Sequence, residues 1–397
     1  MHIALIVTDL SPPRIGGISK VATEITVNYL KKGHSVDVFC LKRTCDVFEK
    51  QDNLRLICID SIFQIYKDYP VVSFSIHAFR RLLEEHKKKA YDVSHAMNFN
   101  NFGMTFVRSQ LRKAGITHIS TAFETTEMEI EAKWSEFKGK PTFHCLAQIV
   151  MELFLAPWQK SYIGWADQIT TEDTETKRNL LKKGIADEKI TLIPSGIDIS
   201  VVDEIIQKHP LKKEEGVFKV CCPGRVDARK GTQFLLKAFA EFSTKVEHAR
   251  LEFVGGGRGD YLEQMQQLAK SLNISEKVHF TGRVDEILPY YLQSDIIVIP
   301  SLSEGIPITL QEALAFKKPV LCSKLPGTYA FASHLSAIKW FETGNVEELS
   351  NQLHEMLSED FSSAVEDGRK FIENYDWSQV AQAYLDCYEK AVTKESS

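Results

Sequence analysis

Two glutamates, Glu304 and Glu312, flank a Gly-Ile-Pro turn in the segment SLSEGIPITLQEAL, residues 301–314. The segment follows the apolar run DIIVIP and precedes a helix-like stretch, and Pro307 suits the first turn of a helix. Peptide N–H groups at such a helix start attract an anion, and carboxylates accept hydrogen bonds from the hydroxyls of a ribose or a hexose. The segment therefore favours a ligand that combines sugar and phosphate, against the alternative of two ordinary surface carboxylates.

A second loop, CPGRVDARKG at residues 222–231, carries the cations Arg225, Arg229 and Lys230 between a strand-like run and a helix-like one. Three cations in one turn repel each other unless an anion lies among them. A guanidinium offers phosphate a two-pronged contact and an ammonium offers a point charge. The loop favours a phosphate site over a solvated basic turn.

Glycine-rich turns follow two further strand-like runs. RIGGIS, residues 14–19, places Gly16 and Gly17 before a helix, where open backbone amides could receive an anion or simply form a tight turn. VGGGRG, residues 254–259, fails the dinucleotide fingerprint because Asp260 stands where its third glycine belongs, and no P-loop motif occurs. A dehydrogenase and a P-loop NTPase are therefore disfavoured, whereas close approach of a ligand to the backbone at this turn stays open.

These loops belong to a chain in which strand-like and helix-like segments alternate. We expect strands at residues 2–8, 34–40, 91–97, 117–123, 167–172, 189–198, 217–222, 249–255, 277–282, 295–300 and 318–323. Such alternation predicts parallel sheets, and ligands bind outside the carboxyl ends of their strands.

The alternation is interrupted at residues 199–215, a polar segment that we interpret as a linker, and 397 residues suffice for two domains. The predicted fold class is therefore α/β, with two Rossmann-like doubly wound domains facing each other across a cleft. We place the first domain at residues 1–195 and the second at residues 196–375. An amphipathic helix within residues 376–397 is expected to fold back on the first domain.

Composition narrows the class of protein further. A net charge of −5 and a pI near 6.2 disfavour nucleic acid as the main partner. The eight cysteines form no CxxC pair and several lie in apolar runs, which predicts reduced thiols in a cytoplasmic protein. The N-terminal MHIALIVTDL lacks the basic region of a signal peptide, and no apolar run approaches the length of a membrane span.

Two segments leave a membrane contact open. Positive charge is concentrated between Arg80 and Lys113, as expected of a solvated helix face or of a surface for an anionic acceptor or membrane. Residues 143–165 are apolar and aromatic, which fits a buried or acceptor-lining helix. The alternative is a helix that lies on the inner face of a membrane, together with those cations.

Taken together and in order, several stretches resemble the retaining glycosyltransferases of the GT-B fold, family 4 (glycosyltransferase group 1). SEGIPITLQEALAFKKPVLCS resembles the E-x7-E signature of that family, and GRVDARKG resembles its donor loop. SPPRIGGISKVATEITVNYLKKGHSVDVF, YDVSHAMN and KITLIPSGID resemble its first loop and helix, a following strand and its interdomain segment. The resemblance covers nearly the whole chain. It implies an enzyme of the hexosyltransferase class that moves a sugar from a nucleoside-diphosphate sugar to an acceptor hydroxyl.

The resemblance also implies roles for individual residues. Arg225 and Lys230 would bind the diphosphate, Glu304 the hydroxyls of the donor sugar and Glu312 the ribose. Backbone contacts to the donor are implied for Gly16, Gly17, Gly305, Ile306, Thr309 and Leu310, and we add Gly224 and Gly255 from the glycine-bearing loops at strand ends.

The implied chemistry needs no metal and no cofactor. The sequence contains no D-x-D, and fixed cations with a helix end can stabilise the leaving diphosphate. Retention would follow from attack on the leaving-group face, with a phosphate oxygen taking the acceptor proton. Many members carry His-Asp or His-Thr where this chain has Phe123-Glu124, so Glu124 is our remaining polar candidate for a catalytic group there.

The expected partners are a UDP- or GDP-sugar and a saccharide, lipid-linked or small-molecule acceptor, with no nucleic acid. Two alternatives use the same fold: a nucleotide-sugar epimerase or hydrolase, and a catalytically degenerate binding subunit. The phenylalanine at position 123 favours the degenerate subunit, whereas Arg225, Lys230, Glu304 and Glu312 argue against it.

Overall fold

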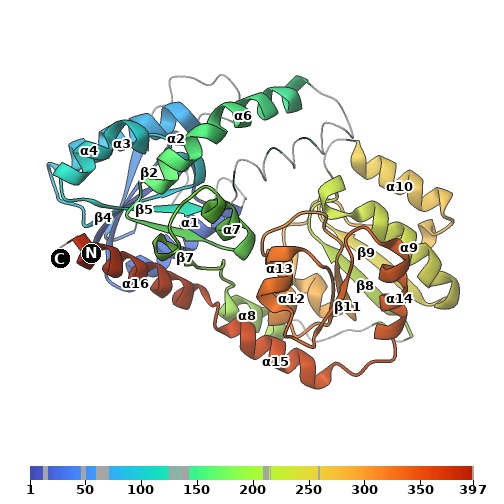
Figure 1. The fold of residues 1–397 in the computed structure, drawn as a ribbon. Coiled ribbons are helices and arrows are strands. Elements are labelled where there is room, and N and C mark those ends of the chain that lie inside the picture. The colour runs from blue at the N-terminus through green and yellow to red at the C-terminus, as the bar shows by residue number, and fades with distance from the viewer. Residues whose placement is uncertain are drawn as a thin grey trace. The chain divides into compact units, whose positions relative to one another are not determined.

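The computed structural model describes residues 1–11, 17–45, 51–59, 71–123, 125, 130, 134, 143–208, 214, 216–257 and 260–395. Its contacts divide the chain into two compact α/β units (Figure 1). Unit 1 comprises Met1–Ser195 with Trp377–Ser397, and unit 2 comprises Gly196–Asp376.

Unit 1 is built on a parallel sheet of seven strands in the order β3-β2-β1-β4-β5-β6-β7. The strands are β1 (His2–Ile6), β2 (Ser35–Leu41), β3 (Leu54–Ile59), β4 (Val93–Met97), β5 (Thr117–Ala122), β6 (Gln168–Thr171) and β7 (Ile190–Leu192). Every residue of β1, β4 and β5 is buried, as expected for parallel strands covered on both faces. The sequence did not lead us to expect β3, an edge strand in which Ile57 and Ile59 are buried and the other four residues are partly or largely exposed.

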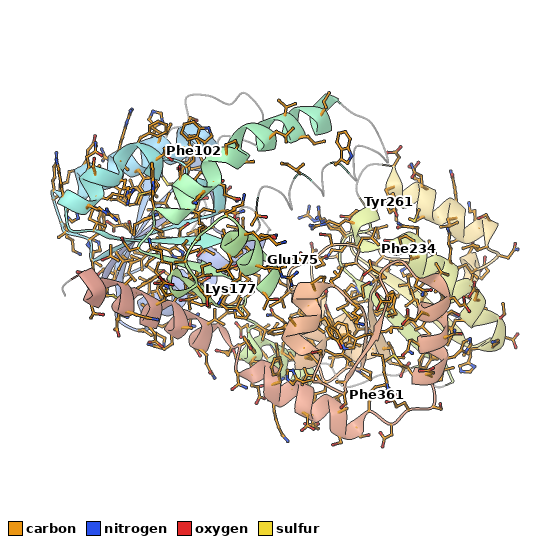
Figure 2. The ribbon with its side chains drawn as sticks, in the orientation of Figure 1. Phe102, Glu175, Lys177, Phe234, Tyr261 and Phe361 are labelled. Carbon is orange, nitrogen blue, oxygen red and sulfur yellow. A yellow bond between two sulfur atoms is a disulfide. The ribbon has the colours of Figure 1, made fainter. Side chains whose placement is uncertain are left out.

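Helices cover both faces of this sheet. They are α1 (Gly17–Lys31), α2 (Lys42–Cys45), α3 (Val71–His86), α4 (Met104–Lys113), α6 (Phe143–Gly164), α7 (Thr174–Lys182) and α16 (Trp377–Glu395), with 3₁₀ turns η1 (Asn98–Asn101) and η2 (Asp187–Lys189). Phe102, labelled in Figure 2, packs its ring 5.9 Å from that of Tyr162 in α6. The last helix, α16, contacts α1, β5 and β6. The C-terminal helix therefore folds back on the first domain, as predicted.

A chain of neutral polar side chains lies between α16 and the sheet of unit 1. The hydroxyl of Tyr388 lies 2.9 Å from that of Tyr29 and 2.6 Å from Nδ1 of His95. The other ring nitrogen of His95 lies 2.6 Å from Oγ1 of Thr121, which in turn lies 2.6 Å from Oγ1 of Thr170. All five side chains are fully or almost fully buried. We call them the Tyr388 network.

Unit 2 is built on a second parallel sheet, of six strands in the order β10-β9-β8-β11-β12-β13. The strands are β8 (Phe218–Pro223), β9 (Ala249–Val254), β10 (Val278–Phe280), β11 (Ile296–Ile299), β12 (Val320–Ser323) and β13 (Ile338–Phe341). The helices are α8 (Ile199–Lys208), α9 (Thr232–Lys245), α10 (Tyr261–Ser271), α11 (Leu288–Gln293), α12 (Ile308–Ala315), α13 (Pro326–Ala332), α14 (Val346–Met356) and α15 (Ser362–Glu373), with η3 (Ala228–Lys230) and η4 (Ser275–Lys277). Both units share the doubly wound order of a Rossmann-like sheet, which confirms the predicted fold class.

Two expectations from the sequence were wrong. Residues 199–208 of the predicted linker form α8, because Asp198 accepts a hydrogen bond from the N–H of Val201 and Val202 is buried in the apolar core of unit 2. The prediction that the cysteines are reduced thiols was also wrong for two of them, because Cys45 and Cys58 form a disulfide. The turn of α2 brings Cys45 back beside β3, and the two Cα atoms lie 6.2 Å apart.

The helix α6 presents apolar side chains on an outward face. Leu146, Val150 and Leu153 are 41%, 59% and 56% exposed and share that face at spacings of four and three residues. Ile149 and Tyr162 of the same helix are buried. Within the described ranges, no helix combines the length and the apolar character needed to cross a bilayer.

Candidate active site

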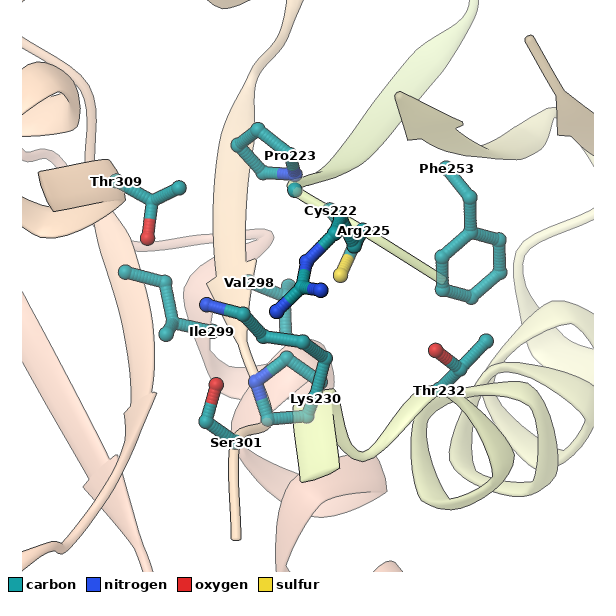
Figure 3. Close-up of a pocket in the computed structure, with 12 residues that line it drawn as sticks. Cys222, Pro223, Arg225, Lys230, Thr232, Phe253, Val298, Ile299, Ser301 and Thr309 are labelled. Atoms are coloured by element: carbon teal, nitrogen blue, oxygen red, sulfur yellow. The ribbon is translucent and has the colours of Figure 1, made fainter. Parts of the chain in front are cut away.

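A pocket opens at the carboxyl ends of β8 and β11 in unit 2 (Figure 3). Its empty volume is about 280 Å³, including the open mouth. Its lining residues are Cys222, Pro223, Gly224, Arg225, Lys230, Thr232, Phe253, Val298, Ile299, Pro300, Ser301 and Thr309. The pocket therefore joins the two segments from which the sequence predicted phosphate and sugar contacts.

Two glycines let the loops after β8 and β9 lie against each other. Gly224 has φ +122° and Gly255 has φ +145°, backbone conformations that side chains other than glycine rarely adopt. The N–H of Gly224 donates to the carbonyl of Val254 at 2.9 Å. A Cβ on Gly255 would collide with the carbonyl oxygen of Gly224. Both glycines shape the pocket edge, and Gly224 lines it.

The turn η3 positions Lys230. Oδ1 of Asp227 accepts a hydrogen bond from the N–H of Lys230 at 3.0 Å, which caps the turn. Gly231 follows with φ +70°, and a Cβ there would collide with the carbonyl oxygen of Pro300. The N–H of Leu302 donates to the carbonyl of Arg229 at 2.7 Å. The cationic loop and the loop after β11 are thus held together by backbone contacts.

Lys230 and Glu304 form an ion pair inside this frame. The Nζ atom of Lys230 lies 2.5 Å from Oε1 of Glu304, and the side chains are 19% and 13% exposed. Ser301 donates a hydrogen bond from Oγ to the same carboxylate at 3.2 Å. Burial alone would raise the pKa of Glu304, but the charges of Lys230 and Arg229 and the Ser301 hydrogen bond outweigh it and hold this pKa below its usual range. Glu304 is therefore ionised at neutral pH.

Arg225 is held more loosely. Its guanidinium is 57% exposed and lies 3.6 Å from Oδ2 of Asp227. Arg225 and Lys230 both line the pocket, and in Figure 3 the lysine extends toward the side that holds Ile299 and Thr309. The pocket thus offers an exposed guanidinium and a partly buried ammonium to an anion.

The start of α12 forms the opposite side of the pocket. Pro307 is the N-cap residue with φ −65°, so the helix begins one residue later than the sequence suggested. Thr309 lines the pocket, whereas the side chains of Ile306 and Leu310 are buried. The carbonyl of Gly305 accepts a hydrogen bond from Oγ1 of Thr328 at 2.7 Å, which fixes the loop before the helix.

Glu312 lies deeper in unit 2, within α12, and is 7% exposed. The hydroxyl of Tyr291 in α11 donates to Oε2 of Glu312 at 2.6 Å. Burial, followed by the charge of Glu312, raises the pKa of Tyr291 well above its ordinary value, so the phenol stays a donor. Sequence reasoning missed Tyr291, because nothing in its local sequence marks a partner 21 residues away.

Unit 1 supplies less of the predicted site. Gly17 is exposed at the first position of α1. Phe123 is buried at the end of β5, where its N–H donates to Oδ1 of Asn98 at 3.1 Å. Gly16 and Glu124, two further candidates, lie outside the described residues. A metal site is also not evident, since no cluster of three or more His, Cys, Asp and Glu side chains occurs in the described part of the chain.

Known protein families match both units. The model described as "Glycosyltransferase Family 4" matches residues 15–201, and the one described as "Glycosyl transferases group 1" matches residues 202–375. Alpha-monoglucosyldiacylglycerol synthase of Streptococcus pneumoniae is 23% identical over 90% of this chain and 83% of its own length.

Solved structures show the same fold. Sucrose-phosphate synthase from Thermosynechococcus elongatus superposes with a TM-score of 0.75 at 21% identity, covering 99% of each chain. Anabaena HepE in complex with UDP gives a TM-score of 0.71 at 16% identity, covering 98% of this chain and 100% of the other.

Proposed function

Because the chain belongs to the group 1 glycosyltransferases of family 4, an enzyme family that uses nucleotide-sugar donors, we propose that the pocket of unit 2 binds the donor diphosphate and the sugar attached to it. The observation that carries this proposal is the Lys230–Glu304 pair at the carboxyl ends of two parallel strands. A partly buried cation suits a phosphate and a carboxylate beside it suits sugar hydroxyls.

In this proposal, candidate residues of unit 2 contact the diphosphate, the sugar and the ribose. Lys230 and the exposed guanidinium of Arg225 bind the diphosphate, and the backbone around Gly305 and Thr309 supports the phosphate and the sugar. Glu304 accepts hydrogen bonds from sugar hydroxyls. Glu312, oriented by its hydrogen bond from Tyr291, accepts from the ribose.

The proposed reaction is transfer with retention of configuration and without a metal. The bond from the anomeric carbon to the diphosphate oxygen breaks, and the acceptor oxygen forms the new bond on the same face. The acceptor proton moves to the leaving phosphate oxygen. Lys230 and Arg225 stabilise the charge that develops on the diphosphate. An inverted anomeric centre in the product, read from the NMR coupling constant, would refute this mechanism.

The relatives suggest which partners to try first. The Anabaena structure contains UDP, and the name of the Streptococcus enzyme describes a glycosylated diacylglycerol as its product. A UDP-sugar is therefore the first donor to test, with GDP- and ADP-sugars beside it. Saccharide, lipid-linked and small-molecule acceptors follow.

Peripheral contact with a membrane and a cytoplasmic location stay predictions from the sequence. The observation that bears on membrane contact is the exposed apolar stripe of Leu146, Val150 and Leu153. Sedimentation with vesicles of anionic lipid tests it, with Val150→Glu as the variant that should reduce binding. Equal sedimentation of the variant and the wild type would remove the stripe from consideration.

A thermal-shift panel of UDP-, GDP- and ADP-sugars on the wild type and on Lys230→Ala tests the donor site. A donor that raises the melting temperature of the wild type but not of the variant supports the proposal and identifies the base. If no nucleotide shifts the wild type, a degenerate binding subunit becomes the better explanation. Consumption of donor without an acceptor would instead favour a hydrolase or an epimerase.

A further inference from the structure

Glu304 and the diphosphate must compete for the same cation. Lys230 lines the pocket, yet its ammonium lies 2.5 Å from Oε1 of Glu304. The carboxylate is 13% exposed and its pKa lies below the usual range, so it is charged whenever a ligand arrives at neutral pH. A phosphate that reaches Lys230 therefore finds its ammonium already paired with the carboxylate of Glu304.

The competition is unequal because Glu304 is poorly hydrated. A charged group that is largely withdrawn from water loses solvation and needs a partner of opposite charge or a set of hydrogen bonds. The Ser301 hydroxyl gives it one such hydrogen bond at 3.2 Å. When Lys230 moves toward a phosphate, the carboxylate of Glu304 loses its cation and its other acceptor positions receive no hydrogen bond. This cost weakens binding of the phosphate.

A nucleoside diphosphate and a nucleotide sugar differ in the hydrogen-bond donors that they offer to the carboxylate of Glu304. The diphosphate brings anionic oxygens, which repel the carboxylate. The nucleotide sugar also brings hydroxyl groups, which can donate to it. The carboxylate of Glu304 therefore weakens binding of the nucleoside diphosphate and strengthens binding of the nucleotide sugar.

We propose that the Lys230–Glu304 ion pair discriminates between the nucleotide-sugar donor and the nucleoside diphosphate that remains after transfer. This inference rests on the proposed function, since it assumes that the sugar hydroxyls reach Glu304. Once the sugar has moved to the acceptor, Glu304 loses its hydroxyl partners and recovers Lys230. The diphosphate then loses part of its contact with Lys230 and dissociates. Glu304 is therefore a specificity residue that favours binding of the substrate over binding of the product.

Isothermal titration of the wild type and of Glu304→Gln tests this directly. The ligands are UDP, GDP, ADP, inorganic pyrophosphate and the UDP-, GDP- and ADP-sugars. The neutral amide no longer competes for Lys230, so the nucleoside diphosphate of the matching base and pyrophosphate should each bind about tenfold more tightly, or about 1.4 kcal/mol. The nucleotide sugar should bind no more tightly than before. The ratio of the two dissociation constants, diphosphate over sugar donor, should therefore fall at least tenfold.

Glu342→Gln provides the matched control. Glu342 lies in the same unit and pairs with Lys324 at 3.2 Å, but its side chain is 65% exposed. This variant should leave all the dissociation constants unchanged. A Glu304→Gln protein that binds the diphosphate no more tightly than the wild type, or that shifts both ligands by one common factor, would overturn the inference.

Two further outcomes keep the test decisive. If Glu304→Gln does not fold, the wild type decides the question alone, because the proposal requires a sugar donor to bind more tightly than the diphosphate of the same base. Equal or tighter binding of the diphosphate than of every matching sugar donor overturns it. A wild type that binds no nucleotide overturns the donor site together with the inference, whereas nucleotide binding with an unchanged ratio overturns the inference alone.

Discussion

The two units bury polar side chains in different ways. In unit 1, the Tyr388 network joins tyrosine, histidine and threonine side chains, and burial followed by the charge of His118 lowers the pKa of His95 to about 3, so the ring is neutral at physiological pH. In unit 2, Lys230 and Glu304 remain charged at the edge of a pocket. One cluster is neutral and enclosed, and the other is charged and faces a site where a ligand can enter.

The difference follows from how many hydrogen bonds each group can still make. In the network, each hydroxyl and ring nitrogen is matched to a neighbour on another element, which favours one arrangement of α16 on the sheet. An ammonium has three donors and a carboxylate accepts at two oxygens, so an ion pair keeps capacity for a ligand. A neutral network thus suits the fixed packing of a helix on a sheet, and a partly exposed ion pair suits exchange of one partner for a ligand.

The largest expected effect is loss of catalysis on breaking the ion pair. Lys230→Ala should lower kcat/KM by about 10³-fold, because the leaving diphosphate loses a fixed cation. It should also lower the melting temperature by leaving Glu304 without its cation. The double variant Lys230→Ala/Glu304→Gln should recover the melting temperature but not the activity.

Lys324→Ala, which removes an exposed lysine of the same unit, is the control for this prediction. If Lys230→Ala keeps near wild-type turnover, Lys230 has no part in the reaction.

Mild acid should destabilise unit 1 through its buried histidines. His95 and His118 are buried and their pKa values are lowered to about 3, whereas an unfolded histidine titrates near 6.5. Between those values the unfolded chain binds more protons, so the stability present above pH 6.5 is lost progressively as pH falls. At pH 5 the free energy of unfolding should be about 2 kcal/mol lower for each histidine than at pH 7.

Urea unfolding at pH 7, 6 and 5 measures this loss, and between pH 7 and pH 5 His95→Gln should lose about 2 kcal/mol less stability than the wild type. An identical pH dependence in the variant would show that His95 is not the group that titrates.

A single hydroxyl of the Tyr388 network should count for less. Tyr388→Phe leaves the ring in place but removes the partner of Tyr29 and of His95. We expect about 1–2 kcal/mol lower stability in urea unfolding, with unchanged donor affinity. Tyr375→Phe serves as the matched control, because the pKa of Tyr375 is raised by burial alone and no polar partner contributes to the shift. A changed donor affinity in Tyr388→Phe would contradict the assignment of this network to the fixed packing of a helix on a sheet.

The smallest effect tests a neutral hydrogen bond inside the charged unit. Tyr291→Phe removes the donor to Glu312, so the carboxylate should be less well oriented toward the ribose. KM for the donor should rise about fivefold with little change in kcat, which corresponds to about 1 kcal/mol. A fall in kcat at unchanged KM would place Tyr291 outside ribose binding.

Most of the fold could be predicted because buried parallel strands are nearly continuous apolar runs. Segments such as HIALI and IIVI show this plainly. The strands β3 and β13 were not predicted, because an edge position permits partly exposed residues such as Arg55 and Lys339. The helix α8 was missed although Val202, Ile205 and Ile206 recur at helical spacing, because the segment was interpreted together with the polar residues that follow it.

Several of the predicted site residues lie together where chemistry and loop position coincide. Arg225, Lys230, Gly224 and Thr309 all line one pocket, because strand ends of a parallel sheet meet at one edge. The sequence did not indicate that Lys230 pairs with Glu304, because 74 residues separate them and contact depends on the packing of β8 beside β11. The roles of Tyr291 and Ser301 were hidden for the same reason.

The position of α16 has a consequence for synthesis on the ribosome. Unit 2 is encoded without interruption, so all of its contacts become available once Asp376 has left the exit tunnel. The sheet of unit 1 is translated first, yet Tyr384 and Tyr388, which bury its surface, arrive after the whole of unit 2. The first-made half of this enzyme therefore completes its folding last. A nascent chain that stalls before residue 377 would expose apolar surface beside α1 and would be a substrate for chaperones.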